Sequence, residues 1–181
     1  MPRTGRTASV KVAALMLLGA ATLVGACDRD QPRAGRDGGM AGADSALQQA
    51  MADSTQWPSY GRDYSNRRFS PLSQITAQNV KQLKLAWRYN TGIPHSFEAS
   101  PVVLDGTLYI STPLNHVIAL DAATGAKKWE YAHDFDSTVH CCGPVNRGVA
   151  VYDGRVYMGA LDAKLVALDA GDGRKVWEHK V

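Results

Sequence analysis

The 181-residue sequence lacks the motifs that most quickly assign a protein to a functional class. It contains no Walker loop, no G-x-S-x-G elbow and no G-x-G-x-x-G after an expected strand, so nucleotide binding and serine hydrolysis have no support. Its 20 Lys and Arg and 17 Asp and Glu residues form no block of like charge longer than two residues. That balance argues against a nucleic-acid partner or a polybasic membrane face.

Cysteine and histidine are also scarce, with three and five residues, and no CxxC or HxxxH spacing occurs among them. A zinc site built from His133, His140 and the adjacent Cys141 and Cys142 is therefore not expected. The 17 Gly, eight Pro and four Trp residues are spread over short segments. This distribution favours strands joined by turns and argues against a helical bundle.

The first 27 residues are typical of a secretory signal. Three basic residues precede an uncharged run at residues 12–26, and 15 residues are short for a bilayer span. The run ends in Leu-Val-Gly-Ala before Cys27, which resembles the lipobox of bacterial lipoproteins and makes Cys27 the expected lipid anchor. The alternative is an ordinary signal cleaved near Ala26. Both interpretations predict an exported, periplasmic protein, in a compartment where disulfides persist.

Residues 28–56 contain no aromatic residue and interleave glycines with Arg and Asp, which predicts a flexible linker. Within it, Ser45–Met51 is long enough for a turn or two of helix, but it lacks an apolar face wide enough to dock. The folded part is expected to run from Trp57 to Val181.

An internal repeat of 48 residues is the most informative pattern. Asp105-Gly106-x-Leu-Tyr-Ile finds its counterpart in Asp153-Gly154-x-Val-Tyr-Met, and the segment from Ala119 to Trp129 returns as Ala167 to Trp177. A period of this length, made of short apolar runs, is typical of propeller blades with about four strands each. We therefore predict an all-β propeller of four-stranded antiparallel blades.

The residue types inside the repeat agree with this fold. Each Asp-Gly dipeptide is a hairpin signal, and Asp121 with Gly125 predicts a capped turn in which the glycine has a positive φ. Trp129 and Trp177 are expected to pack between blades, with the indole N–H bonded to a backbone acceptor. These roles are structural, and no chemistry is expected from these residues.

A weaker copy of the repeat, with Leu83-x-Leu-Ala-Trp87 and Thr91-Gly92, precedes the first full unit. The sequence thus contains about two to three blades. Propellers usually close with four to eight blades, and two blades alone leave unpaired sheet edges. We therefore expect the sequence to be the N-terminal piece of a larger propeller.

Three features between and before the repeats are candidates for chemistry. A disulfide between the neighbours Cys141 and Cys142 would be strained, because trans-linked Cα atoms lie only about 3.8 Å apart. A vicinal ring, two reduced buried thiols and intermolecular disulfides all remain open. Arg147, in a Gly-rich turn, suits bidentate binding of a carboxylate, and its alternative is a surface ion pair. Glu98, just before an apolar strand, is either a site residue or a solvated loop acid.

Together these residues resemble a known family. The opening Trp57-x-x-Tyr-Gly-Arg-Asp-x-x-Asn-x-Arg-x-Ser-Pro-Leu72, the Trp-bearing repeats and Cys141-Cys-Gly-Pro-Val-Asn-Arg-Gly-Val-Ala150 are similar to quinoprotein alcohol and methanol dehydrogenases. The similarity runs from Trp57 to Val181. It implies a periplasmic, eight-bladed propeller that uses pyrroloquinoline quinone.

The resemblance also implies roles for individual residues. Cys141 and Cys142 would form a vicinal disulfide that covers one face of the quinone, and Val145 would line the same pocket. Arg147 would hydrogen-bond the quinone's carbonyl or carboxylate oxygens, and Glu98 would contact the cofactor's edge. A flat ring and a guanidinium are reasonable neighbours for a planar ligand that bears three carboxylates.

By the same resemblance, a small alcohol is oxidised to an aldehyde by hydride transfer to the quinone, and the electrons pass to a cytochrome c. Calcium, which needs several hard oxygen ligands, assists this reaction. The resemblance assigns the calcium ligands and the catalytic aspartate to blades after Val181, so no catalytic or metal residue is expected in residues 1–181, which alone should be inactive. The lipobox is a departure from the soluble enzymes.

Two alternatives carry different sequence expectations. A noncatalytic lipoprotein propeller that scaffolds outer-membrane assembly has similar repeats, but no reason to keep Cys141, Cys142 and Arg147. A quinone-dependent sugar dehydrogenase shares the cofactor, but it would be expected to begin with several spanning helices and to lack the cysteine pair. Alcohol dehydrogenase is therefore the first hypothesis.

Overall fold

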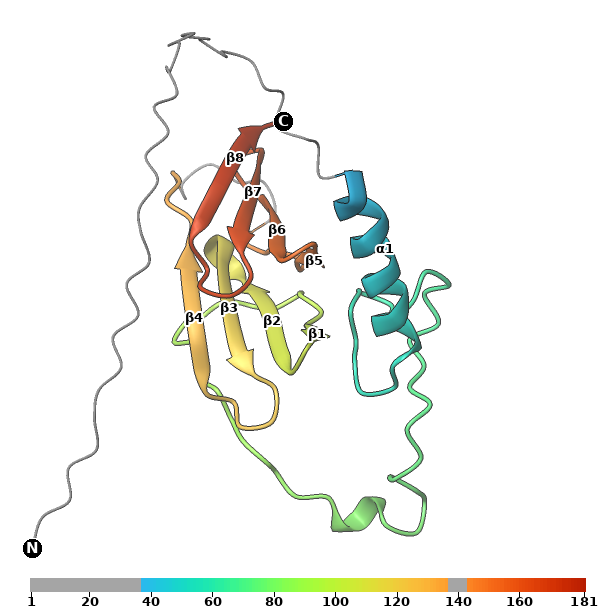
Figure 1. Ribbon diagram of the computed structural model, residues 1–181. Coiled ribbons are helices and arrows are strands. Elements are labelled where there is room, and N and C mark those ends of the chain that lie inside the picture. Colours follow the sequence, from blue (N-terminus) through green and yellow to red (C-terminus); the bar gives the residue numbers. More distant parts are fainter. Residues whose placement is uncertain (1–36, 137–142) are drawn as a thin grey trace, which may run out of the picture. The chain divides into compact units, whose positions relative to one another are not determined.

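The computed structural model describes residues 37–136 and 143–181 of the chain. These residues form two four-stranded antiparallel sheets, in the strand orders β1-β2-β3-β4 and β5-β6-β7-β8 (Figure 1). The first sheet comprises β1 (Val102–Leu104), β2 (Thr107–Thr112), β3 (His116–Asp121) and β4 (Lys127–Ala132). The second comprises β5 (Ala150–Tyr152), β6 (Arg155–Ala160), β7 (Lys164–Asp169) and β8 (Lys175–Lys180). The predicted all-β architecture of consecutive four-stranded blades is confirmed.

The turns follow the predicted chemistry. Asp105 and Gly106 have φ values of 48° and 70°, and Asp153 and Gly154 have 48° and 68°, as a two-residue hairpin with positive φ at both positions requires. The carboxylate of Asp121 accepts a hydrogen bond of 2.8 Å from the Thr124 backbone N–H, and Gly125 has a φ of 72°. The β1–β2 and β3–β4 turns lie at one end of the first blade. The β2–β3 turn and the end of β4 lie at the opposite end, where the His133 N–H donates to the Asn115 carbonyl.

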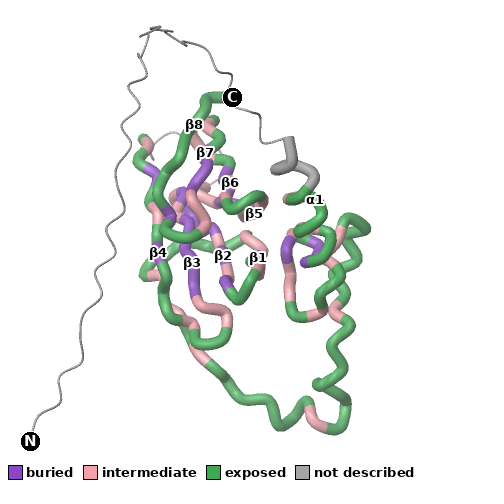
Figure 2. Tube along the Cα trace, viewed as in Figure 1, coloured by how far each residue is buried: buried purple, intermediate pink, exposed green. Residues whose placement is uncertain are grey.

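The main hydrophobic core lies between the two blades. Figure 2 shows the buried stretches on the central strands, where Val117, Ala119, Met158 and Val166 are fully buried. Tyr109 and Trp129 of the first blade join this core, with their ring centroids 5.9 Å apart. Because the core is shared, neither blade buries its apolar face without its neighbour.

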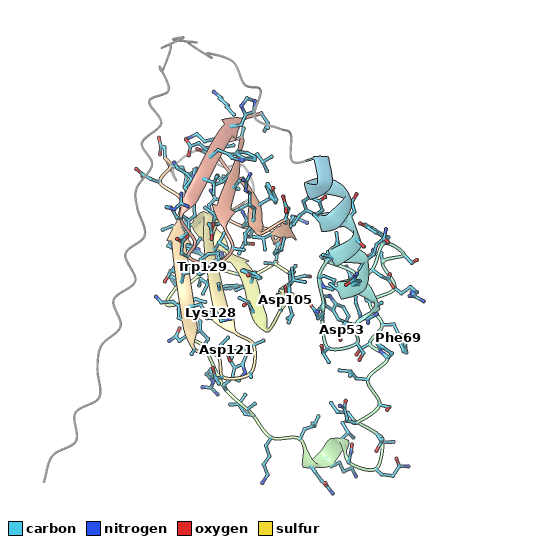
Figure 3. The ribbon with its side chains drawn as sticks, in the orientation of Figure 1. Asp53, Phe69, Asp105, Asp121, Lys128 and Trp129 are labelled. Carbon is cyan, nitrogen blue, oxygen red and sulfur yellow. The ribbon has the colours of Figure 1, made fainter. Side chains whose placement is uncertain are left out.

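Trp129 joins the first blade to the second, as predicted. Trp129 projects from β4 to the β7–β8 turn, where its indole N–H donates to the Ala170 carbonyl over 3.0 Å (Figure 3). A Cβ built on Gly173 would lie 2.5 Å from the Trp129 ring, so the ring packs directly on the glycine. Trp87 docks on the first blade in the same way, with its N–H 3.2 Å from the Ala122 carbonyl and its ring against Gly125.

Trp87 therefore confirms that the weak early copy belongs to the repeat. Residues 83–90 form no strand, but they place the tryptophan as the last strand of a preceding blade would. Before these residues the chain forms a 3₁₀ turn at Val80–Gln82. Further upstream, Trp57 forms an antiparallel bridge with Val103 of β1. A second 3₁₀ turn, Pro113–Asn115, links β2 to β3.

Polar contacts join the blades at the opposite end. The His133 side chain, only 2% exposed, lies 3.1 Å from both carboxylate oxygens of Asp162 in the β6–β7 turn. Its other ring nitrogen lies 3.2 Å from the Tyr131 hydroxyl, and Phe135 stacks on the ring. Lys164 adds an ion pair to Asp162 at 3.2 Å. His133 thus contributes to the interface between the blades.

Helix α1 (Asp37–Ala52) differs from the sequence-based expectation. We predicted at most a turn or two at Ser45–Met51 with no face that docks, but the helix has 16 residues and Ala50 is buried. The predicted linker, residues 28–56, therefore contains a helix that packs on the blades. The reason is that Ala43, Leu47 and Ala50, at helical spacing, form a narrow apolar stripe on one face of α1, and this stripe faces the blades.

The packing of Trp129 on Gly173 predicts a graded response to three alanine substitutions. Gly173→Ala combines a positive φ with the ring contact, Gly154→Ala has only the positive φ, and Gly159→Ala has neither. The left-handed conformation costs about 1–2 kcal/mol and the clash about 1–3 kcal/mol more. Urea unfolding of the full-length protein should rank the losses in that order. Equal losses for Gly173→Ala and Gly154→Ala would contradict the docking role.

The Asp162 contacts predict a dependence of stability on acid pH. Burial opposes ionisation of this carboxyl, but the hydrogen bonds from His133 and Lys164 outweigh it and hold the pKa of Asp162 below its ordinary value of 3.8. The ionised form therefore stabilises the fold above that value, and the contribution is lost as the pH falls through the lower, folded-state pKa.

We expect Asp162→Asn to lower the melting temperature at pH 7 and to flatten its decline between about pH 5 and 2. Thermal unfolding across that range measures both effects. The control is Asp172→Asn, at a carboxylate that is 64% exposed and 3.9 Å from its Arg174 partner. If the melting temperature of Asp162→Asn fell with pH as steeply as that of the wild type, the stabilising role of the Asp162 carboxylate would be contradicted.

Candidate functional site

Two of the predicted cofactor residues meet in the structure. Glu98 precedes β1 and Arg147 precedes β5, so they come from different blades, and Arg147 Nη2 lies 3.2 Å from Glu98 Oε2. The Arg147 side chain is 81% exposed and that of Glu98 is 44% exposed. Such an exposed pair contributes at most about 1 kcal/mol to stability. Its significance therefore lies in the position of a solvent-facing guanidinium at the junction of two blades.

The chain before β5 is shaped to present Arg147. Gly143 and Gly148 bracket the residue with φ values of 92° and 132°, conformations that favour glycine. Val145 is half-buried, Asn146 is 6% exposed, and Arg147 is open to solvent. The Pro144 carbonyl accepts a hydrogen bond of 2.8 Å from Leu114 N–H, which ties this stretch to the β2–β3 turn. Cys141, Cys142 and His140 lie outside the described residues, so the predicted disulfide stays a prediction.

Two asparagines, Asn115 and Asn146, hold this stretch, and neither was predicted to be a site residue. Asn146 Nδ2 donates to Gly159 O over 2.9 Å and to Asn115 Oδ1 over 3.2 Å. Asn146 Oδ1 accepts from Gly148 N–H at 3.2 Å. Asn115 also accepts from the Leu161 N–H, at 3.3 Å. The only signal in the sequence was the place of Asn146 beside Arg147, and nothing marked Asn115, because the second blade has Ala163 at the same repeat position.

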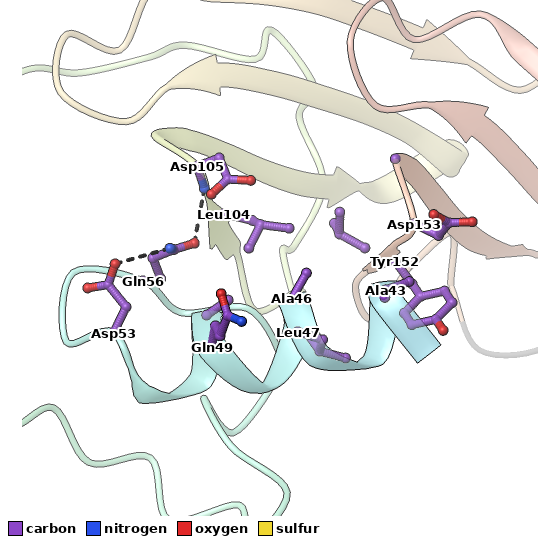
Figure 4. A pocket seen from close by; sticks show the side chains of 14 residues that line it. Ala43, Ala46, Leu47, Gln49, Asp53, Gln56, Leu104, Asp105, Tyr152 and Asp153 are labelled. Carbon is purple, nitrogen blue, oxygen red and sulfur yellow. Dashed lines mark hydrogen bonds between the residues drawn. The ribbon is translucent and has the colours of Figure 1, made fainter. Parts of the chain in front are cut away.

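A separate pocket of about 670 Å³ lies between α1 and the edges of both blades. Figure 4 shows Ala46 of the helix facing Leu104, and Gln56 bonded to both Asp53 and the Asp105 backbone. Its lining is mostly small or apolar side chains and hairpin-turn residues. It therefore offers no arrangement of acid, base and nucleophile comparable to a catalytic site.

Within residues 37–136 and 143–181, no three His, Cys, Asp or Glu side chains gather as a metal site would require. Over the same ranges, no helix is both long and apolar enough to cross a bilayer.

Comparison with known proteins identifies the family. The family model "PQQ: Glucose/ethanol/alcohol dehydrogenase, beta-propeller domain" matches residues 57–179. The chain is 48% identical over 101 residues to quinohemoprotein alcohol dehydrogenase ADH-IIG of Pseudomonas putida, covering 53% of this chain and 14% of that protein. It is 42% identical over 106 residues to 1-butanol dehydrogenase (cytochrome c) of Thauera butanivorans, covering 57% of this chain and 15% of the relative.

A solved structure supports the same assignment. The crystal structure of quinohemoprotein alcohol dehydrogenase from Comamonas testosteroni matches with a TM-score of 0.70 and 44% identity. The match covers 79% of this chain and 23% of that one. The chain thus spans only about a seventh of the length of the curated relatives named above. Its propeller blades, with the Trp-bearing repeat that the family model covers, make it a member of the pyrroloquinoline quinone dehydrogenase β-propeller family.

Proposed function

We propose that the protein to which this chain belongs is a pyrroloquinoline quinone-dependent alcohol dehydrogenase, in which Glu98 and Arg147 form part of the quinone site. The observation that carries the proposal is the 3.2 Å contact between these residues, which come from two blades and which the family resemblance assigns to one cofactor. The relatives support alcohols as the substrate class, since those reported above are named alcohol or butanol dehydrogenases.

The residues present fit the chemistry of the cofactor. Pyrroloquinoline quinone is planar and carries three carboxylates, and a guanidinium is the side chain best suited to bind carboxylates in a plane. Arg147 is 81% exposed, so its remaining N–H groups are accessible to a ligand. Glu98 alone would repel an anionic ligand, but its pairing with Arg147 offsets that charge. Half-buried Val145 adds apolar surface beside the same segment.

Each residue then has a definite task. Arg147 binds quinone oxygens and fixes the orientation of the ring, and Glu98 holds the guanidinium at the blade junction. Cys141 and Cys142, joined as a vicinal disulfide, cover one face of the ring and exclude water from it. When bound, the quinone serves as the hydride acceptor for the alcohol carbon.

The remaining machinery belongs to further blades. We assign the calcium ligands and the catalytic aspartate to them, so residues 1–181 alone should be inactive. The apolar side chains of Phe97 and Trp177, which are 42% and 36% exposed, mark faces that neighbouring blades would cover. A cytochrome c as electron acceptor is consistent with the name of the Thauera butanivorans relative. Export to the periplasm and lipid attachment at Cys27 complete the proposal.

Replacement of Arg147 by Lys tests the cofactor role. Lysine keeps the charge but loses the bidentate geometry, so we expect the full-length protein to bind pyrroloquinoline quinone about tenfold more weakly or worse. The melting temperature without quinone should stay within about 2 °C, because the ion pair is exposed. Arg174→Lys, at another exposed ion pair, is the control and should bind quinone normally. A noncatalytic scaffold would show no specific quinone binding in any variant.

The vicinal disulfide makes an independent prediction. Intact mass measured before and after reduction of the exported protein should differ by two hydrogens, with no change in oligomeric state. The Cys141→Ser variant should show no such difference. An unchanged mass in the wild type would rule out the ring, and a reduction that splits an oligomer would indicate an intermolecular disulfide instead.

A further inference from the structure

Asn115 lies where three segments meet near the proposed site. It occupies the β2–β3 turn with a φ of 57° and is fully buried. Its backbone carbonyl accepts from His133 N–H over 3.2 Å, at the start of the β4–β5 connection. Its side-chain oxygen accepts from Asn146 Nδ2, near the end of that connection, and from Leu161 N–H of the second blade. One residue thus binds both ends of the connection and the neighbouring blade.

The orientation of both amides is determined by backbone partners. A backbone N–H can only donate, so the atom of Asn115 that faces Leu161 N–H must be the oxygen. A carbonyl can only accept, so the atom of Asn146 that faces Gly159 O must be the nitrogen. Asn146 Nδ2 therefore donates to Asn115 Oδ1. Neither side chain can flip without breaking a bond to the backbone.

This arrangement bears on Arg147 because Arg147 follows Asn146 directly. The Arg147 side chain is largely exposed and forms an exposed ion pair with Glu98. Such a pair holds a long side chain only weakly. The bonds of Asn146 to Asn115, Gly159 and Gly148, together with the bond from Leu114 N–H to the Pro144 carbonyl, therefore hold the backbone from which the guanidinium extends.

We propose that Asn115 is a positioning residue for the Arg147 guanidinium, acting through the side chain of Asn146. This inference rests on the proposed function, in which Arg147 binds the quinone. Loss of the Asn115 side chain shifts the 143–148 stretch and moves the guanidinium away from its ligand. Displacement of a binding group by about 1 Å is enough to cost tenfold or more in recognition.

Asn115→Gly is the appropriate variant. Glycine accepts a positive φ and keeps the backbone carbonyl that binds His133 N–H, so the substitution removes the side chain with its accepting oxygen and leaves the backbone contact in place. In the full-length protein, we expect the dissociation constant for pyrroloquinoline quinone to rise about tenfold. The control Leu168→Ala, in the buried part of β7 at the far end of the blade, lowers stability without touching these contacts. It should bind quinone with nearly wild-type affinity.

A double-mutant cycle separates positioning from general stability. In an Arg147→Ala background, Asn115→Gly should change quinone affinity by less than about twofold, because there is no guanidinium left to position. Additive effects of the two substitutions, or wild-type affinity in Asn115→Gly, would overturn the proposal. If Asn115→Gly does not fold, Asn146→Ala removes the same contact from the other side. It should then lower quinone affinity when Arg147 is present and change it little in the Arg147→Ala background.

Hydrogen exchange keeps this inference separate from the proposed function. In Asn115→Gly, the amides of Leu161 and Gly148 should exchange faster, while that of His133 is unchanged. If the wild type binds no quinone, the proposed function fails, and exchange then decides whether Asn115 anchors the segment. Unchanged exchange at Gly148 would overturn the anchoring itself.

Discussion

The docking of a tryptophan on the glycine turn of the next blade is the contact on which the rest of the structure depends. A four-stranded blade cannot bury both of its faces alone, so the chain needs a device that sets the spacing between blades. Trp129 supplies it through its large ring against Gly173 and its N–H on the Ala170 carbonyl. Truncation of a buried tryptophan typically costs about 3–5 kcal/mol, which is comparable to a large share of a domain's stability.

With the spacing set at one end, the opposite end of the blades can hold a site. His133 with Asp162, and Asn115 with Asn146 and Leu161, join the two blades where the β4–β5 connection leaves and returns. Glu98 and Arg147 meet at the same junction. The site is thus built across a blade interface, and its geometry follows from how two blades pack. The proposed positioning of the exposed Arg147 guanidinium by the buried Asn115 rests on this packing.

The sequence predicted those features that repeat. The 48-residue period, the Asp-Gly hairpins and the turn glycines led to the blade architecture, because each depends on local backbone conformation or on a regular apolar pattern. Asn115 was missed because its repeat counterpart, Ala163, shares the positive φ of 58° but not the side chain. Helix α1 was underestimated because its docking stripe is narrow, with Leu47 flanked by Ala43 and Ala50, and gives little hydrophobic signal. Glu98 and Arg147 were singled out separately, and only the fold brings them into contact.

The most direct test of this account is a crystal structure of the full-length protein with pyrroloquinoline quinone bound. The account predicts the quinone at the blade junction, with the Arg147 guanidinium on its oxygens and the Asn115–Asn146 hydrogen bond intact. Quinone bound at another place, with Arg147 still facing only Glu98 and solvent, would contradict it.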